Sequence, residues 1–246
     1  MLGRYTLTDK IVYNENWYFY INENIINSGG YNENKIGMLM EPISILPSLY
    51  FRILNQPDEA LKSFKYFFVH NRVMAGIHPK LIWAPVTAAT WIKEPQIYEK
   101  TKLVSMISSS KVMCSGHFMR IWWARKLCNN IDGYGVLFNN SIESKEIALK
   151  DYMFTICMEN ERTPGYFTEK LIDCFNTGTI PIYWGDPEIE KVFNMDGIIV
   201  LSDSFDITSL TSELYYSKMD AIKENFEIAK NYADIKTYFA YKYPND

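Results

Sequence analysis

The segment from residue 152 to residue 185 limits the folds open to this chain more than any other stretch. It reads YMFTICMENERTPGYFTEKLIDCFNTGTIPIYWG, which is an apolar strand-like run, a charged loop, a helical run and a second apolar run. Thr168 is the expected N-cap of the helix and Gly178 is its expected C′ residue. A strand, a helix and a second strand in succession indicate a parallel sheet that helices cover.

The same alternation is found on both sides of this segment. Further strands are expected at 35–42, 65–71, 102–111, 134–139 and 197–201, and further helices at 44–55, 116–130 and 143–150. A stretch rich in Pro and Trp, residues 81–95, has weak periodicity and separates the two sets. The pattern predicts an α/β protein of two Rossmann-like halves with a cleft between them, divided as 1–95 and 96–228, with a helical tail at 229–246.

Charge and composition exclude several classes of function. The net charge of the 246 residues is −4, so no global basic field exists to hold nucleic acid. No run approaches the eighteen or so apolar residues of a membrane span, and the first residues lack the apolar stretch of a signal peptide. The four cysteines are scattered, without His at metal-ligand spacing, which argues against a zinc site and favours a reducing compartment. We therefore expect a cytoplasmic protein without a membrane span or a nucleic-acid partner.

Charged side chains mark the loop after the strand at 152–159. This loop lies at the carboxyl edge of the predicted sheet, where open α/β sheets bind ligands, and the next helix N-terminus favours a phosphate. Lys170 opposes the helix dipole there and therefore indicates an anion, whereas Glu169 is favoured by the dipole alone. Asn160 can equally be a loop-capping amide.

These residues carry a family resemblance. FTICMEN followed by YFTEKLIDCFNTGTIPIYWG resembles the donor-binding signature of the α-1,3-fucosyltransferases, which are inverting enzymes that use GDP-fucose. The resemblance is strong over residues 102–201 and implies a GT-B fold with an acceptor-side domain first and a donor domain second. It also implies that Glu169 contacts hydroxyls of the nucleotide sugar and Lys170 its diphosphate, while Asn160 and Tyr166 line the same pocket.

The family also has an Arg that binds the diphosphate and a catalytic Glu. Arg120 matches the diphosphate-binding Arg and lies at the same sheet edge, where a guanidinium can hold a diphosphate bidentately. Taken alone, Arg120 is as well explained as a solvated charge on a helix. Glu41 follows a strand and precedes Pro42, which matches the base that an inverting transfer needs, although an exposed turn carboxylate is the alternative. His70 and His117 are further candidates, each weighed against a structural role.

The resemblance implies no required cofactor or metal, and the chain has no Asp-x-Asp triplet, so a divalent cation is expected at most to stimulate the reaction. The expected partners are a nucleotide-sugar donor and a glycan acceptor. Two departures from the family are Glu161, where members have Ser or Thr, and the short first half. The sequence thus predicts fucose transfer from GDP-fucose to a glycan hydroxyl. Transfer of another GDP- or UDP-sugar, and a non-catalytic sugar-nucleotide or glycan-binding protein, stay open, as do the acceptor, the linkage and the oligomeric state.

Overall fold

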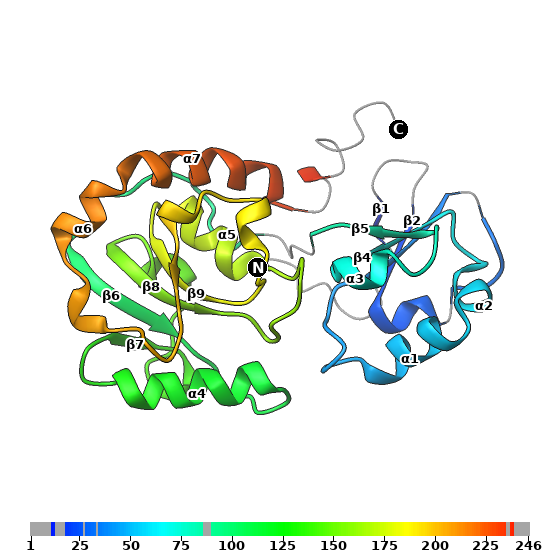
Figure 1. The fold of residues 1–246 in the computed structure, drawn as a ribbon, viewed down its shortest axis with the longest axis horizontal. Helices are drawn as coiled ribbons and strands as arrows, with labels where there is room; N and C mark the ends of the chain where they lie inside the picture. Colours follow the sequence, from blue (N-terminus) through cyan, green and yellow to red (C-terminus); the bar gives the residue numbers. More distant parts are fainter. Residues whose placement is uncertain are drawn as a thin grey trace. The chain divides into compact units, whose positions relative to one another are not determined.

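The chain divides into two compact units (Figure 1). The computed structural model describes residues 11–12, 18–26, 28–32, 34–85, 90–234 and 237–238. The first unit runs to Val86 and also takes in Pro164–Tyr166, and the second comprises Thr87–Thr163 and the chain from Phe167 onward. Most of the predicted helical tail, residues 235–236 and 239–246, lies outside the described residues.

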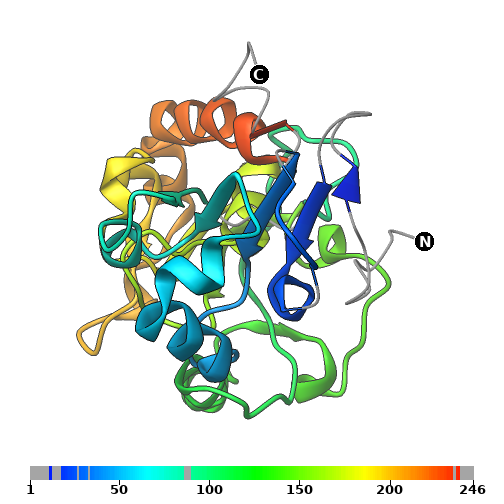
Figure 2. The same cartoon turned by 90° about the vertical axis from the view of Figure 1, so that its right-hand side faces the viewer.

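The first unit is built on a sheet in the order β1-β2-β3-β4-β5 (Figure 2). β1 is antiparallel to β2, and the other neighbours are parallel. Its elements are β1 (Ile11–Val12), β2 (Tyr18–Ile21), β3 (Lys35–Leu39), α1 (Pro47–Asn55), α2 (Pro57–Leu61), β4 (Tyr66–Val69), α3 (Arg72–Ala75) and β5 (Leu81–Trp83). Leu49, Tyr50 and Ile53 of α1 are buried in the same core as Phe67 and Val69 of β4, because their spacing puts them on one side of the helix.

The second unit holds a parallel sheet in the order β10-β9-β8-β6-β7. Its elements are β6 (Lys102–Ile107), α4 (Ser115–Leu127), β7 (Asp132–Tyr134), β8 (Tyr152–Met158), α5 (Glu169–Asn176), β9 (Ile180–Trp184), β10 (Ile199–Val200), α6 (Ser212–Ser217) and α7 (Met219–Ala229). The crossover through α4 leads from β6 to β7, toward one edge of the sheet, and the crossover through α5 leads from β8 to β9, toward the other edge. Right-handed crossovers therefore place the two helices on opposite faces (Figure 1).

Local signals set the bounds of α5 as the sequence predicts. The Thr168 hydroxyl accepts the backbone N–H of Lys170 at 3.4 Å and begins the helix. Gly178 follows the C-cap with φ +69°, and a Cβ there would lie 2.8 Å from Cγ2 of Ile97. Both the handedness and the space at this position therefore require glycine.

Three details of the second unit differ from the sequence prediction. The helix expected at 143–150 is a 3₁₀ turn, Lys145–Ala148. The strand expected at 134–139 is β7, which stops at Tyr134 because Gly135 turns the chain at φ +94° into a 3₁₀ turn, Val136–Phe138. The spacing of the residues at 116–130 predicts a helix with Phe118 and Trp122 on its apolar side and Arg120 on the opposite side. This prediction was wrong, since Phe118 and Trp122 are exposed while Arg120 is buried. Arg120 can be buried because backbone carbonyls accept its hydrogen bonds.

None of the helices in the described part of the chain is long and apolar enough to cross a bilayer.

Candidate functional site

A cavity lies where the winding of the second sheet reverses. β6 and β8 are neighbours in this sheet, although β7 lies between them in the chain, and ligands of open α/β sheets bind beyond the carboxyl ends of such strands. The cavity has a volume of about 200 Å³ and is lined by Ile107, Ser109, Arg120, Lys145, Leu149, Thr155–Met158, Glu169, Lys170, Asp173 and Cys174. Complete ligand pockets measure roughly 300–1,000 Å³, so this space suits part of a ligand.

Glu159 is a fully buried carboxylate that organises the N-terminus of α5. Its Oε1 accepts the backbone N–H of Thr168 at 2.8 Å, and its Oε2 accepts the Thr168 hydroxyl at 2.8 Å and the Lys170 ammonium at 3.1 Å. Burial by itself lowers the pKa of Lys170, but the carboxylates of Glu159 and Glu169 more than reverse this and raise it. Lys170 is therefore a cation that already has an anion inside the protein.

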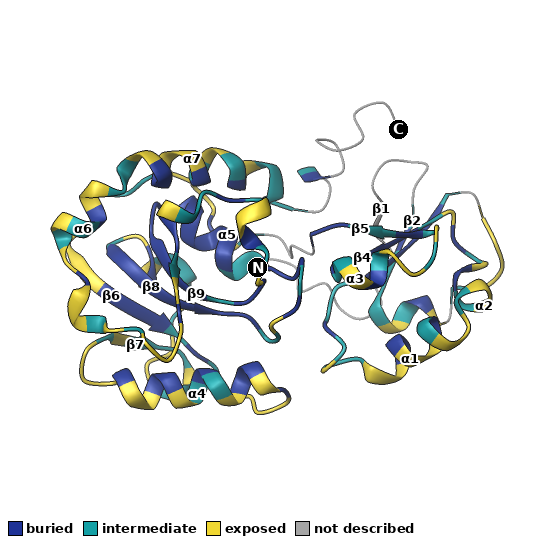
Figure 3. Ribbon diagram, viewed as in Figure 1, coloured by how far each residue is buried: buried dark blue, intermediate teal, exposed yellow. Residues whose placement is uncertain are grey.

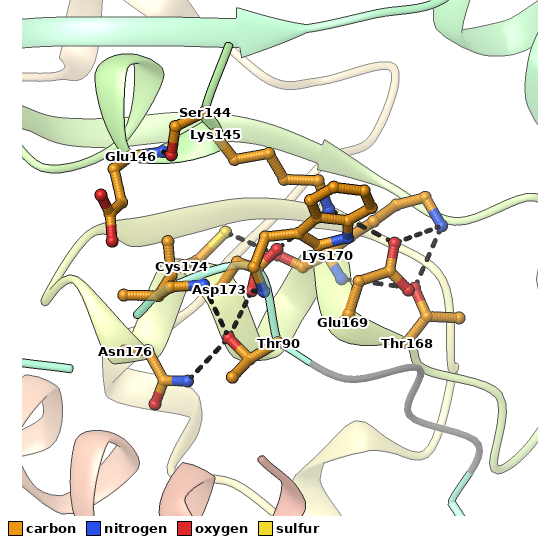
Figure 4. Close-up of polar contacts among 12 residues, drawn as sticks. Thr90, Ser144, Lys145, Glu146, Thr168, Glu169, Lys170, Asp173, Cys174 and Asn176 are labelled. Atoms are coloured by element: carbon orange, nitrogen blue, oxygen red, sulfur yellow. Dashed lines mark hydrogen bonds and ion pairs between the residues drawn. The ribbon is translucent and has the colours of Figure 1, made fainter. Parts of the chain in front are cut away.

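Lys145, from the 3₁₀ turn Lys145–Ala148, forms a second group of charges with two carboxylates of α5 (Figure 4). Its Nζ lies 2.9 Å from Oδ2 of Asp173 and 3.4 Å from Oε1 of Glu169. Oδ1 of Asp173 accepts the Thr90 hydroxyl at 2.6 Å and the backbone N–H of Trp91 at 2.9 Å. Burial raises the pKa of Asp173.

Glu169 lies between the two lysines. Burial raises the pKa of its carboxyl group, but Lys170 and then Lys145 lower it more, to about 2. Glu169 is therefore ionised at neutral pH and can accept hydrogen bonds from hydroxyl groups.

Arg120 is held against the carboxyl end of β8. Its Nη2 donates to the carbonyls of Met158 at 2.9 Å and Glu159 at 3.3 Å, and to Oδ1 of Asn160 at 3.2 Å. α4 can approach this closely because of Gly116, where a Cβ would lie 2.4 Å from the carbonyl oxygen of Asn160. Arg120 and Lys170 consequently line one cavity, although they come from two different crossover helices.

The charges around the cavity balance in number but not in exposure. The carboxylates of Glu159 and Asp173 are 0% and 1% exposed, whereas Lys170 and Lys145 keep 26% and 23% of their side-chain surface exposed. Glu169 is 17% exposed and Arg120 is buried, so the most exposed charges around the cavity are the two ammonium groups. A molecule that enters the cavity meets ammonium groups first, which favours an anion.

Three of the predicted site residues belong to the first unit. Glu41 lies two residues beyond β3, is half-buried, and its carbonyl accepts the Tyr50 hydroxyl at 3.1 Å. His70 is buried between Leu39, whose carbonyl oxygen lies 3.2 Å from its Nδ1, and the Tyr50 hydroxyl, 3.2 Å from its Nε2. The Tyr166 ring is also buried, with its centroid 4.5 Å from that of His70. Tyr166 does not line the cavity of the second unit.

His117 lies on the inner side of α4. Its Nδ1 accepts the backbone N–H of Met113 at 3.1 Å. Burial and then the nearby Arg120 lower the pKa of its imidazole, so the ring is neutral at pH 7. These contacts account for His117 as a structural residue, and its place in ligand binding stays a prediction.

Three residues of the site were not predicted from the sequence: Glu159, Lys145 and Asp173. A sequence feature could have identified Glu159. It is a carboxylate at the end of an uncharged strand, shortly before a helix N-cap, and such a residue lies next to the N-terminus of that helix. No comparable sequence feature marks Lys145, since it comes from a separate 3₁₀ turn, Lys145–Ala148. Among the described residues, no three His, Cys, Asp or Glu side chains gather as a metal-binding group.

Comparison with known proteins decides the family. Residues 97–242 match the family model described as glycosyltransferase family 10 (fucosyltransferase), C-terminal part. The chain belongs to this family. The α-(1,3)-fucosyltransferase FucT of Helicobacter pylori is 35% identical over 102 residues, which cover 40% of this chain and 21% of that protein. A protein of Acanthamoeba polyphaga mimivirus that is named as a fucosyltransferase is 37% identical over 94 residues, 36% of this chain and 16% of that one. The chain thus covers about a fifth of the length of these relatives.

A solved structure supports the fold class. The crystal structure of an α1,3-fucosyltransferase with GDP aligns with a TM-score of 0.52 at 18% identity, over 78% of this chain and 66% of that one. This likeness, together with the two parallel-stranded units, confirms the predicted α/β fold of GT-B type.

Proposed function

We propose that this member of the family is an inverting fucosyltransferase that moves fucose from GDP-fucose to a hydroxyl group of a glycan. The observation that carries the proposal is the cavity beyond β6 and β8, where Arg120 and Lys170 line one space and the ammonium groups of Lys170 and Lys145 are more exposed than the carboxylates. The names of the relatives and the family of the chain support fucose as the sugar. The GDP in the related structure supports the nucleotide.

In this proposal the second unit binds the donor. Arg120 and Lys170 hold the diphosphate, the first with a planar guanidinium whose orientation the end of β8 fixes, and the second at the start of α5. Glu169 accepts hydrogen bonds from donor hydroxyls, which its low pKa permits. Asn160 lies beside the Arg120 guanidinium, and we assign it to the donor pocket. Tyr166 does not line the cavity of the second unit, and its assignment to the donor pocket rests on the family resemblance alone. The corresponding domain roles are acceptor side for 1–95, donor side for 96–228 and helical tail for 229–246.

The reaction needs a base and a stabilised leaving group. We assign the base to Glu41, which takes the proton of the acceptor hydroxyl while that oxygen attacks the anomeric carbon of fucose. The bond between this carbon and the diphosphate oxygen breaks at the same time, and the electron pair leaves with GDP. Arg120 and Lys170 offset the negative charge that develops on the diphosphate.

Ligand-induced thermal stabilisation tests donor binding. GDP at 100 times its Kd should stabilise the chain by about 2.7 kcal/mol, or roughly 5–10 °C in Tm, and UDP should stabilise it much less. Lys170→Ala should remove the GDP-induced shift in Tm. The shift is measured against the variant's own ligand-free Tm, because the loss of the Glu159–Lys170 ion pair lowers that Tm. Lys223→Ala changes an exposed lysine of α7 and should keep the shift. Equal stabilisation by UDP would contradict the assigned donor.

Turnover separates an enzyme from a binding protein. Radiolabelled GDP-fucose should be transferred to a glycan or slowly hydrolysed by the native chain. Stabilisation by GDP with no transfer or hydrolysis would refute catalysis and leave the non-catalytic binding protein as the better account.

A further inference from the structure

The outer side of α4 carries large apolar side chains at the surface of the second unit. Phe118 is 60% exposed and Trp122 is 48% exposed, and one helical turn separates them, so they lie side by side. In the turn before the helix, Val112 and Met113 are 54% and 62% exposed. Figure 3 shows the exposed positions of α4 in yellow. Such a cluster is unlike the scattered single apolar residues of an ordinary surface.

Cations border these apolar side chains. Arg125 and Lys126 follow Trp122 on the same side of α4 and are exposed, and Lys111 precedes Val112 and is exposed as well. The Lys126 ammonium lies 4.9 Å from the centroid of the Trp122 ring. We call this surface, made of Lys111–Met113, Phe118, Trp122, Arg125 and Lys126, the α4 patch.

The charge of the α4 patch differs from that of the chain as a whole. The sequence has 29 Asp and Glu residues, yet none occurs from Thr101 to Ile131. A chain with a net charge of −4 thus has one segment without acidic residues, and this segment supplies both the cations and the exposed aromatic rings of the patch. This segregation of charge points to an anionic partner.

The combination of aromatic rings and cations selects the kind of partner. A second copy of the chain that used the same patch would bring like charges together, because a two-fold contact pairs a surface with itself. Anionic lipid matches both features, since aromatic rings lie at the level of the headgroups while Lys and Arg contact the lipid phosphates. We propose that the α4 patch docks this protein on an anionic lipid surface, with α4 parallel to the membrane plane.

This docking is peripheral and independent of the proposed transfer reaction. α4 has 13 residues, fewer than the roughly 20 that span a bilayer. The inner side of α4 carries the buried Arg120, and the patch residues lie on the outer side. Changes to the patch should therefore leave nucleotide binding as it is and lower Tm by a few degrees at most, because Trp122 also packs edge-to-face against the buried Trp123.

Vesicle flotation tests the proposal. Each of the three exposed cations should raise the affinity for an anionic surface roughly fivefold. Binding to vesicles of phosphatidylcholine and phosphatidylglycerol should therefore be on the order of 100-fold stronger than binding to phosphatidylcholine alone. This binding should weaken as the salt concentration rises. The double variant Phe118→Ser/Trp122→Ser should lose flotation while it stays folded, with a Tm only a few degrees below that of the native chain. Its control is Tyr216→Ser, which removes an aromatic ring that is 54% exposed on α6 and should float as the native chain does.

A second pair of variants isolates the charges. Arg125→Gln/Lys126→Gln should weaken binding to anionic vesicles about 25-fold, whereas Lys191→Gln/Lys223→Gln, which removes two exposed lysines elsewhere in the unit, should change it little. Equal binding of the native chain to neutral and anionic vesicles, or flotation of the patch variants at native strength, would overturn the proposal. A third outcome would also overturn it. If the native chain self-associates without lipid and Phe118→Ser/Trp122→Ser abolishes this self-association, the patch joins two copies of the chain.

Discussion

The replacement Glu159→Gln is the sharpest probe of how the second unit holds its charges. The glutamine has the same shape, and its carbonyl oxygen can still accept the backbone N–H of Thr168, which lies 2.8 Å from Oε1 in the native chain. Its amide group, however, is a donor that faces the Thr168 hydroxyl and the Lys170 ammonium, both of which now donate to Oε2. The substitution thus leaves Lys170 without the anion beneath it.

The structure sets the size of the effect. Removal of one partner from a buried ion pair costs about 3–5 kcal/mol. Glu159 is fully buried, but Lys170 keeps 26% of its side-chain surface exposed and can recover part of its hydration, so we expect the lower limit, about 3 kcal/mol. For a chain of this size that loss lowers Tm by roughly 6–12 °C.

Calorimetry of the native chain, Glu159→Gln and the control Glu190→Gln measures this loss. Glu190 is an exposed carboxylate of the same unit, and its replacement should change the free energy of unfolding by less than about 0.5 kcal/mol. The variant Glu159→Gln/Lys170→Met should be more stable than the sum of its single substitutions by about 1–2 kcal/mol. Inorganic phosphate should also stabilise Glu159→Gln more than the native chain, because the charged groups around the cavity then have a net positive charge, although Lys170 keeps the Glu169 carboxylate at 4.0 Å. A loss below 1 kcal/mol in Glu159→Gln would refute the view that Glu159 is the internal anion of this site.

Two other predictions concern the carboxylates. Glu41→Gln should leave the GDP-induced rise in Tm intact and lower fucose transfer by about 10²–10⁴-fold, and full activity in this variant would contradict its role as the base. The pKa of Glu169 falls from 4.5 to about 2 on folding, so its ionised form stabilises the fold above pH 4.5, and this contribution is lost as the pH falls toward 2. At about 1.4 kcal/mol per pKa unit, the native chain loses about 3 kcal/mol of unfolding free energy from this group. Urea titrations should therefore show that Glu169→Gln loses less stability between pH 4.5 and 2 than the native chain does. Parallel curves for the two proteins would contradict the low pKa of Glu169.

The sequence predicted the parts of the fold that local signals control. β8, α5 and β9 have the predicted order and nearly the predicted bounds, because the Thr168 hydroxyl and the left-handed Gly178 act on their own neighbours. The convergence of Arg120 and Lys170 could also be expected, because the carboxyl ends of neighbouring parallel strands meet at one edge of a sheet.

The rest depends on contacts between distant residues. Lys145 contacts Asp173 across 28 positions of the chain, a pairing that no local pattern encodes. The buried side of α4 was predicted wrongly because the helix has apolar residues on both sides, which makes periodicity a poor guide to burial. The carbonyls that accept hydrogen bonds from Arg120 decide which side is buried. Lys170 indicated an external anion in the sequence, whereas the structure shows that Glu159 already supplies an internal one.

A crystal structure of this chain with GDP tests the central claim most directly. The account predicts that the diphosphate lies beyond the carboxyl ends of β6 and β8, with its oxygens within hydrogen-bonding distance of the Arg120 guanidinium and the Lys170 ammonium. A diphosphate bound elsewhere, with these two side chains still directed only at the protein, would contradict the proposed donor site.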